Sequence, residues 1–506
     1  MAGEAVYTPP ESLRGPVLAG VKWKLISQIL REGTRLAIGI LLARLLTPEE
    51  WGVASLALVI ASLLTVLADV GLPVALVQRA RIDELDRSTL FWTALGLGIA
   101  FTAVGIALSG LVADIFGEPE LQSLFAVLCI GFTIAGLEKV PGSLLARDLA
   151  FRALELRQIA ATTGGAAVAL ALALAGAGAW AIIGNSLTTT VVSCALLWVV
   201  TPWRPRLVFS WNSFRSLTGF GGTLLAAQLV TYVQMNADRL LIGRYVGAAG
   251  VGVYSFAYQL MFTPILNVTY PLQMVLFPVF ATIQEDIQRL NALWLRTKRL
   301  SVALMAPAFL LLLVVAPDLL PALFGSQWDD AIPILQVLCL AGVAYSLTTQ
   351  NGILLLAQGK AGTNFWLTVF ATVVVVASVA VGLHWGTLGV ATGFAVAHWS
   401  LVLPYTWITT KAASIGFLLT LRATCSPLPF AAVATAAAYG VRLGLLETGT
   451  PTAARILIVA ATLLSVYAGL AYVGSAPLRE EIREALDRLR SRRTRDVATA
   501  GSATEP

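Results

Sequence analysis

One helical face near the start of the chain carries polar side chains that suit an anion. Four residues share this face because they recur at steps of four, three and four: Lys24, Gln28, Arg31 and Arg35. An Arg near the centre of a bilayer costs about 3 kcal/mol or more, so such a residue faces a bundle interior or a water-filled cavity. Guanidinium groups bind phosphate oxygens in bidentate geometry. The pattern therefore predicts a cavity-facing site for a phosphate-bearing molecule.

The same residues also fit an internal network. Glu32 lies beside the basic face and is expected to reach Arg35, while Arg31 extends to the inner membrane surface. Both interpretations place the charges away from lipid, so the sequence leaves them open.

A second polar group lies where two apolar segments approach the outer side. Its members are Arg44, Asn236, Asp238, Arg239 and Arg244. Asp238 could pair with any of the three arginines. A pair that forms only when the outer side closes would be a gate, and a permanent clamp between helices explains the residues equally well.

Amide side chains in later apolar segments are candidate contacts for sugar hydroxyl groups. They are Gln234, Gln259, Gln350 and Asn351, of which the last two are expected in the middle of a helix. Hydrogen bonding between helices is the alternative use of such groups. No catalytic residue, metal site or cofactor is predicted, because the chain has only two His, and its four Cys form no CxxC pair.

Composition defines the class of protein. Of 506 residues, 57% are hydrophobic and 12% are charged, and the mean hydropathy is +0.80. Soluble domains carry about 25% charged residues, so the chain is expected to be an all-α polytopic membrane protein. The net charge of +6 is spread over loops, which argues against a nucleic-acid partner.

Fourteen apolar segments are long enough to span a bilayer. They cover residues 20–46, 51–77, 89–113, 120–146, 156–176, 179–201, 217–243, 250–280, 299–317, 330–357, 363–383, 386–408, 425–446 and 454–475. With both termini in the cytoplasm, the inside segments hold most of the 34 Lys and Arg, including Lys298, and the outside loops hold Arg244, Arg442 and Arg455. This asymmetry follows the positive-inside rule. Acidic residues in the outside loops are expected to lack basic partners: Asp114, Glu118, Asp318, Asp329 and Asp330.

Two short sequence repeats, in the same order in both halves of the chain, indicate an internal duplication. Arg44, Gly52 and Ser55 recur two hundred positions later as Arg244, Gly252 and Ser255. At an offset of 210, Val127-Leu128-Cys129 recurs as Val337-Leu338-Cys339, and Gly142-x-Leu144-Leu145 recurs as Gly352-x-Leu354-Leu355. Duplicated halves with a site between them are typical of transporters.

Several motifs resemble one family of membrane transporters. The stretches are LLARLLTPEEWGVASLALVIASLLTVLADVGLPVALVQR from Leu41, VPGSLLARDLAF from Val140 and NADRLLIGRYVGAAGVGVYSFAYQL from Asn236. They are similar to the polysaccharide-export branch of the superfamily that contains oligosaccharide flippases, lipid II flippases and multidrug exporters. The resemblance implies two pseudo-symmetric six-helix lobes around a central cavity, plus two peripheral C-terminal helices.

The expected organisation runs from end to end of the chain. It comprises a cytoplasmic segment 1–19, an N-lobe 20–201, a cytoplasmic linker 202–216, a C-lobe 217–408, two further helices 409–475 and a basic amphipathic cytoplasmic tail 476–506.

The resemblance also implies a cargo. We expect a non-enzymatic flippase of the inner membrane that moves a polyprenyl-pyrophosphate-linked oligosaccharide outward by alternating access. Its expected partners are this lipid-linked glycan, membrane lipids and polysaccharide assembly proteins, and a monomer is expected. The alternatives are a multidrug exporter of the same fold, which would need carboxylates for cationic drugs, and a lipid II-type flippase.

Overall fold

The protein is represented by a computed structural model that describes residues 14–68, 83–148, 150–211, 214, 221–475 and 479–480. Nearly all of these residues are helical, and none of them lies in a β-strand. The first-half helices are α1 (Arg14–Leu45), α2 (Pro48–Ala68), α4 (Glu84–Phe116), α5 (Pro119–Arg147), α6 (Phe151–Leu174) and α7 (Trp180–Val200). Residues 476–478 and 481–506 of the predicted tail, like residues 1–13, lie outside the described part.

The second half continues the helical pattern with short breaks. Its helices are α9 (Gly221–Tyr245), α10 (Ala248–Pro264), the π-helical turn η1 (Ile265–Thr269), α11 (Tyr270–Thr282), α12 (Ile287–Phe324), the 3₁₀ turn η2 (Ser326–Trp328), α13 (Ala331–Thr348), α14 (Asn351–Ala357), α15 (Ala361–Gly382), the 3₁₀ turn η3 (Leu383–Trp385), α16 (Gly386–Ala413), α17 (Phe417–Cys425), α18 (Leu428–Glu447) and α19 (Thr452–Gly474).

Local chemistry sets the turn between α1 and α2. Thr47 Oγ1 accepts from the backbone N–H of Glu50, while the Glu50 carboxylate accepts from the backbone N–H of Thr47 at 2.7 Å. This reciprocal capping box starts a helix, and Pro48 suits its first position because no backbone donor is needed there. This turn falls between the predicted spans 20–46 and 51–77.

Eleven stretches of the described chain are helical, long and apolar enough to cross a membrane. One of them, Ala361–Ala413, contains both α15 and α16, and neither α1 nor α9 is among the eleven. The all-α membrane fold is therefore confirmed, whereas the count of fourteen spans stays a prediction.

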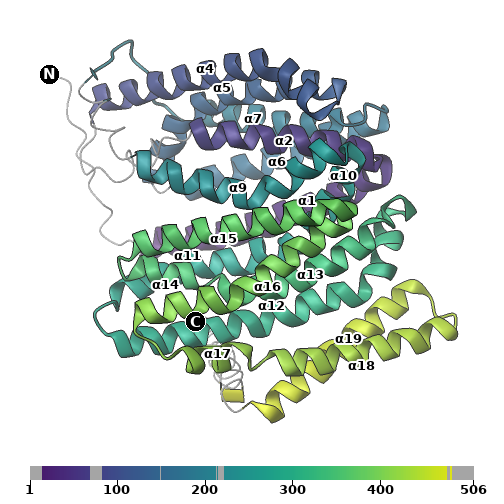
Figure 1. The fold of residues 1–506 in the computed structure, drawn as a ribbon. Helices are drawn as coiled ribbons and strands as arrows, with labels where there is room; N and C mark the ends of the chain where they lie inside the picture. The colour runs from purple at the N-terminus through teal and green to yellow at the C-terminus, as the bar shows by residue number, and fades with distance from the viewer. Residues whose placement is uncertain are drawn as a thin grey trace, which may run out of the picture. The chain divides into compact units, whose positions relative to one another are not determined.

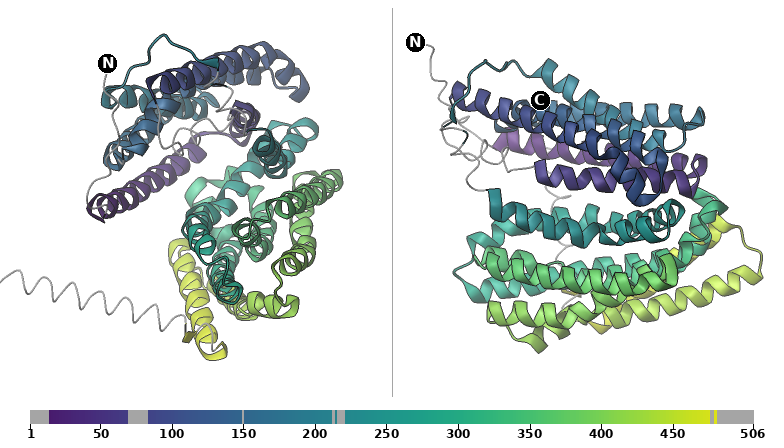
Figure 2. Two further views of the ribbon diagram at one scale, coloured as in Figure 1. Left: turned by 90° about the vertical axis from the view of Figure 1, so that its left-hand side faces the viewer. Right: turned by 45° about the horizontal axis from the view of Figure 1, so that its top comes forward.

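The chain divides into two compact units. Unit 1 covers residues 1–256, 323–331 and 368–393, and unit 2 covers residues 257–322, 332–367 and 394–506. In unit 1, α4 packs along α5 and α6 along α7, with α1 against α6; in unit 2, α18 packs along α19 (Figures 1 and 2). The division into N-lobe, linker, C-lobe and C-terminal helices follows other boundaries and stays a prediction.

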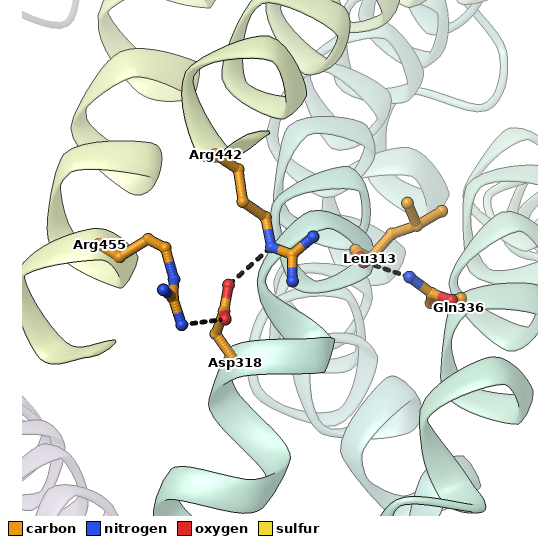
Figure 3. Close-up of polar contacts among 5 residues, drawn as sticks. All are labelled: Leu313, Asp318, Gln336, Arg442 and Arg455. Atoms are coloured by element: carbon orange, nitrogen blue, oxygen red, sulfur yellow. Dashed lines mark hydrogen bonds and ion pairs between the residues drawn. The ribbon is translucent and has the colours of Figure 1, made fainter. Parts of the chain in front are cut away.

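A buried ion-pair triad joins three helices of unit 2 (Figure 3). Asp318 of α12 accepts from Arg442 Nε of α18 and from Arg455 Nη2 of α19, both at 2.6 Å. The expectation that Asp318 has no basic partner was wrong, because its partners lie more than a hundred residues away in sequence. The triad adds charge pairing to the apolar contact of α12 with α18 and α19, which Val314, Ala434 and other buried side chains form.

Two further expectations were wrong in unit 2. Lys298 does not lie in a cytoplasmic loop, because α12 starts eleven residues earlier and buries the side chain completely. Gln350 and Asn351 do not lie within a continuous helix, because α13 ends at Thr348 and α14 begins at Asn351.

Candidate functional site

The basic face of α1 packs in part against α6. Arg31 Nη2 lies 3.6 Å from Glu155 Oε2, and the Ser27 hydroxyl donates to the same carboxylate oxygen. Glu155 thereby offsets one of the predicted cavity cations. Nothing in the spacing of residues along α6 marks Glu155 as a partner of α1, so this contact could not be predicted from the sequence.

The other members of the face differ in exposure. Arg35 Nη1 contacts Glu32 Oε1 at 2.8 Å, and 60% of the Arg35 side chain is exposed. Gln28 is half-buried, and the side chain of Lys24 lies outside the described part. The Glu32–Arg35 pair of the network interpretation is thus confirmed. Whether the face binds cargo stays a prediction.

The two matched glycines of the internal repeat touch each other. A Cβ atom on Gly52 would overlap the carbonyl oxygen of Ala248 and lie 2.9 Å from the backbone N of Gly252. A Cβ atom on Gly252 would overlap the carbonyl oxygen of Pro48 and lie 3.1 Å from the backbone N of Gly52. Because Ala248 and Pro48 are also two hundred residues apart, the contact is reciprocal, as at a two-fold axis. We call this contact the glycine crossing of α2 and α10.

Aromatic rings surround the glycine crossing. Trp51 meets Phe256 and Trp328 edge to face, each with ring centroids 5.6 Å apart, and Phe256 stacks on Trp328 at 4.0 Å. Trp328 Nε1 also donates to the carbonyl oxygen of Ala43 at 2.7 Å. All four residues are at least nine-tenths buried, so this end of the α1–α2 hairpin is closed.

The predicted gate residues lie on the hairpins that meet at the crossing. Arg44 Nε donates to the carbonyl oxygen of Leu323 at 2.7 Å. Asp238 is almost fully buried and accepts from the Tyr254 hydroxyl at 2.7 Å, a partner that the sequence analysis did not identify. The remaining residues make short-range contacts: Arg239 with Asn236 at 3.4 Å, and Arg244 over the ring of Tyr245 at 5.8 Å.

The four candidate amides fall into two environments. Gln234 is half-buried and Gln259 is exposed, whereas Gln350 and Asn351 are completely buried. Asn351 Oδ1 accepts from Lys298 Nζ at 2.7 Å. Among the described residues, no group of three or more His, Cys, Asp or Glu could hold a metal ion.

The described residues are almost all helical, and the α1–α2 and α9–α10 hairpins meet in a reciprocal contact, an arrangement typical of transporters. Structural comparison agrees on the fold. A lipid II flippase MurJ in an inward closed conformation superposes with a TM-score of 0.68 at 14% identity, covering 90% of this chain and 98% of that one. An inward-facing multidrug resistance MATE transporter of the MOP superfamily gives 0.63 at 18% identity, covering 76% and 94%.

Sequence comparison identifies the family. Residues 41–333 match the family described as "Polysaccharide biosynthesis protein", so this chain belongs to it. The lipopolysaccharide biosynthesis protein WzxC of Escherichia coli K12 is 29% identical over 76% of this chain and 78% of that protein. The succinoglycan biosynthesis transport protein ExoT of Rhizobium meliloti is 27% identical over 96% and 98%. The predicted resemblance is confirmed.

Proposed function

We propose that this chain is a flippase that moves a polyprenyl-pyrophosphate-linked oligosaccharide from the inner to the outer leaflet of the cytoplasmic membrane. Family membership and the named roles of WzxC and ExoT in lipopolysaccharide and succinoglycan biosynthesis support a glycan cargo. The fold shared with MurJ and MATE transporters supports transport rather than enzymatic chemistry. Both termini are assigned to the cytoplasm, and the working unit to a monomer.

The glycine crossing carries the proposal. Alternating access needs a contact that closes one side of the membrane completely and opens without unfolding a helix. At Gly52 and Gly252 the two helices approach backbone to backbone, and buried rings seal the surroundings. Such a contact is made of dispersion and neutral hydrogen bonds, which are weak one by one. It suits a gate that opens in each transport cycle.

The charges of α1 supply the physical means of moving an anionic head group. Bare transfer of a charged group into hydrocarbon costs tens of kcal/mol by Born solvation, and cations that line its path remove most of that cost. Arg35 is largely exposed, and Arg31 is held by Glu155. We assign Arg35 the first contact with a phosphate. Arg31 then exchanges its bond to Glu155 for one to the cargo.

A multidrug exporter for cations is the less favoured function. It would need carboxylates that are free to meet a cationic drug. Glu32 of α1 and Glu155 of α6, the carboxylates that contact the basic face in the described part of the chain, are both engaged by arginines. The same engagement favours an anionic cargo.

The test is surface polysaccharide in cells that carry Arg31→Ala, Arg35→Ala or both. A charge-assisted hydrogen bond is worth about 1.5–3 kcal/mol, or roughly 10-fold to 150-fold, so each single variant should lower export by at least tenfold. Arg479→Ala is a matched control, because Arg479 contacts only the end of α19 in the described chain. Normal polysaccharide with both substitutions, at normal expression, would remove the assigned cargo contacts.

Transport in proteoliposomes tests the energetics separately. Moving two negative charges out of a negative interior gains about 4.6 kcal/mol per 100 mV. The rate should therefore rise with an inside-negative potential. A transport rate that does not change with the membrane potential would show that a counter-ion travels with the cargo.

A further inference from the structure

Unit 2 contains a short break between α13, which ends at Thr348, and α14, which begins at Asn351. It leaves the carbonyl oxygens of Thr349 and Gln350 beside the end of a helix. Gln273 Nε2 donates to the first at 2.9 Å, and Trp294 Nε1 donates to the second at 3.0 Å. Broken helices at membrane depth persist only where other groups satisfy the freed backbone, and in transporters they mark binding sites.

Lys298 lies against this interruption and is completely buried. Its Nζ donates to Asn351 Oδ1 at 2.7 Å and sits 4.9 Å from the centre of the Trp294 ring. Within the described residues no carboxylate pairs with it: its hydrogen-bond partner is the Asn351 amide, and the titratable group near it is the Cys425 thiol. A buried cation without a counter-charge costs several kcal/mol. An anion beside Nζ would offset the cost of keeping this buried amine charged.

The side chains around Lys298 have unused donors. Gln350 is completely buried, and neither atom of its side-chain amide has a hydrogen-bond partner in the described chain. The same holds for Asn351 Nδ2 and for the hydroxyl of Ser301, which lies one turn from Lys298 on α12. Buried polar groups are nearly always paired, and each unpaired one costs about 1–3 kcal/mol. An anion that reached Gln350 Nε2, Asn351 Nδ2 and the Ser301 hydroxyl would satisfy these three donors, whereas Gln350 Oε1 is itself an acceptor and would not contact it.

We propose that the buried polar cluster of Lys298, Ser301, Gln350 and Asn351 binds a small inorganic anion of chloride's size. The four are rich in N–H and O–H donors and include no acid. Apolar side chains enclose the neighbourhood, among them Phe280 and Leu354. That enclosure favours a monatomic anion over a bulky, strongly hydrated phosphate. This site is independent of the proposed function, because it uses neither Arg31 nor Arg35, and it gives Gln350 and Asn351 a role other than the sugar contacts predicted from the sequence.

The experiment measures thermal unfolding of the purified full-length protein in detergent. Chloride replaces gluconate at constant ionic strength, so that screening stays the same. Anion binding to the folded state should raise Tm by a few degrees, with saturation as chloride increases. Bromide should act like chloride, because both are monatomic.

Lys298→Met should abolish the chloride response, or weaken the apparent affinity at least tenfold. Lys411→Met is the matched control: Lys411 also lies over a tryptophan, 5.1 Å from the Trp407 ring, but is exposed, so its loss should leave the response unchanged. Gln350→Leu covers the case in which Lys298→Met fails to fold. It removes an amide without a partner while its carbonyl bond to Trp294 remains, so the variant should fold and respond at least threefold more weakly.

Three results would overturn the proposal. The first is a wild-type Tm that does not respond to chloride or bromide. The second is a full response in both Lys298→Met and Gln350→Leu. The third is a Tm that changes with pH but not with halide, because this would mean that the buried charge is relieved by loss of a proton.

Discussion

Substituting either glycine of the crossing by alanine should hold the α2–α10 contact open. The added Cβ atom at Gly52 would overlap the carbonyl oxygen of Ala248, and the one at Gly252 would overlap that of Pro48. To restore an ordinary carbon–oxygen contact, the helices must separate by about 1 Å or more, which forfeits part of the dispersion energy along the crossing. Overpacking of this kind costs about 1–3 kcal/mol. The closed state would lose population by roughly 5-fold to 150-fold.

Alanine also favours a helix over glycine by about 0.5–1 kcal/mol. That gain applies to the open and closed states alike, so it leaves their ratio unchanged. The clash exists only in the closed state. Both single variants should therefore fold normally and differ from wild type in the ratio of the open state to the closed state.

Reciprocity makes the double variant informative. Either added Cβ atom separates the same two helices, α2 and α10. Once one alanine has separated them, the second alanine should cost little further free energy. Gly52→Ala with Gly252→Ala should thus shift the equilibrium far less than the sum of the single effects. Gly39→Ala on α1 is the control, because no atom lies within 4 Å of its added Cβ.

The assay is labelling of a cysteine at Ala43, which is completely buried beside Trp328 in the closed contact. Cys425, the most exposed native cysteine, is first replaced by serine. A membrane-impermeant maleimide should label Ala43→Cys slowly in the wild-type background and several-fold faster in each glycine variant. Equal labelling in all backgrounds, or strictly additive effects in the double variant, would refute the reasoning.

Two further substitutions test other charged contacts. Asp318→Asn should lower the Tm by several degrees, because it leaves Arg442 without its carboxylate, and removing one partner of a buried pair costs about 3–5 kcal/mol. Thermal unfolding measures this, with the exposed Asp330→Asn as the control. Equal Tm values for the two variants would contradict the prediction. Glu155→Gln should release Arg31 from its ion pair and raise the affinity for a pyrophosphate lipid about tenfold. Equilibrium binding measures this affinity. An unchanged affinity would mean that Arg31 does not contact the cargo.

Local features of the fold could be predicted from the sequence because their causes are local. The turn after α1 follows from Thr47, Pro48 and Glu50, which lie within four residues of one another. The all-α membrane class follows from composition alone. Matched residues such as Gly52 and Gly252 predict a duplication, yet the sequence did not reveal that these two glycines touch. The position of a two-fold axis is a property of packing, and no single repeat encodes it.

Burial and pairing of charges could not be predicted because they depend on distant segments. Lys298 follows a basic stretch at the start of α12, and by composition it resembles the loop residues before it. Its burial follows from packing within unit 2, where its Nζ meets Asn351 of α14. Glu155 and Asp318 were likewise missed as partners, since each meets arginines more than a hundred residues away. Periodicity places a residue on a helical face but does not identify the helix that covers it.

The chemistry of the contacts distinguishes a joint that moves from one that does not. The Asp318 triad in unit 2 consists of buried ion pairs, and separating them would expose charge to a medium that cannot solvate it. The glycine crossing in unit 1 consists of backbone approach and aromatic rings, and each ring pair is worth about 0.5–1.5 kcal/mol. Conformational changes in transport must cost only a few kcal/mol to be rapid. The crossing meets that condition and the triad does not, so α18 and α19 should move with α12 as one body while α2 and α10 part.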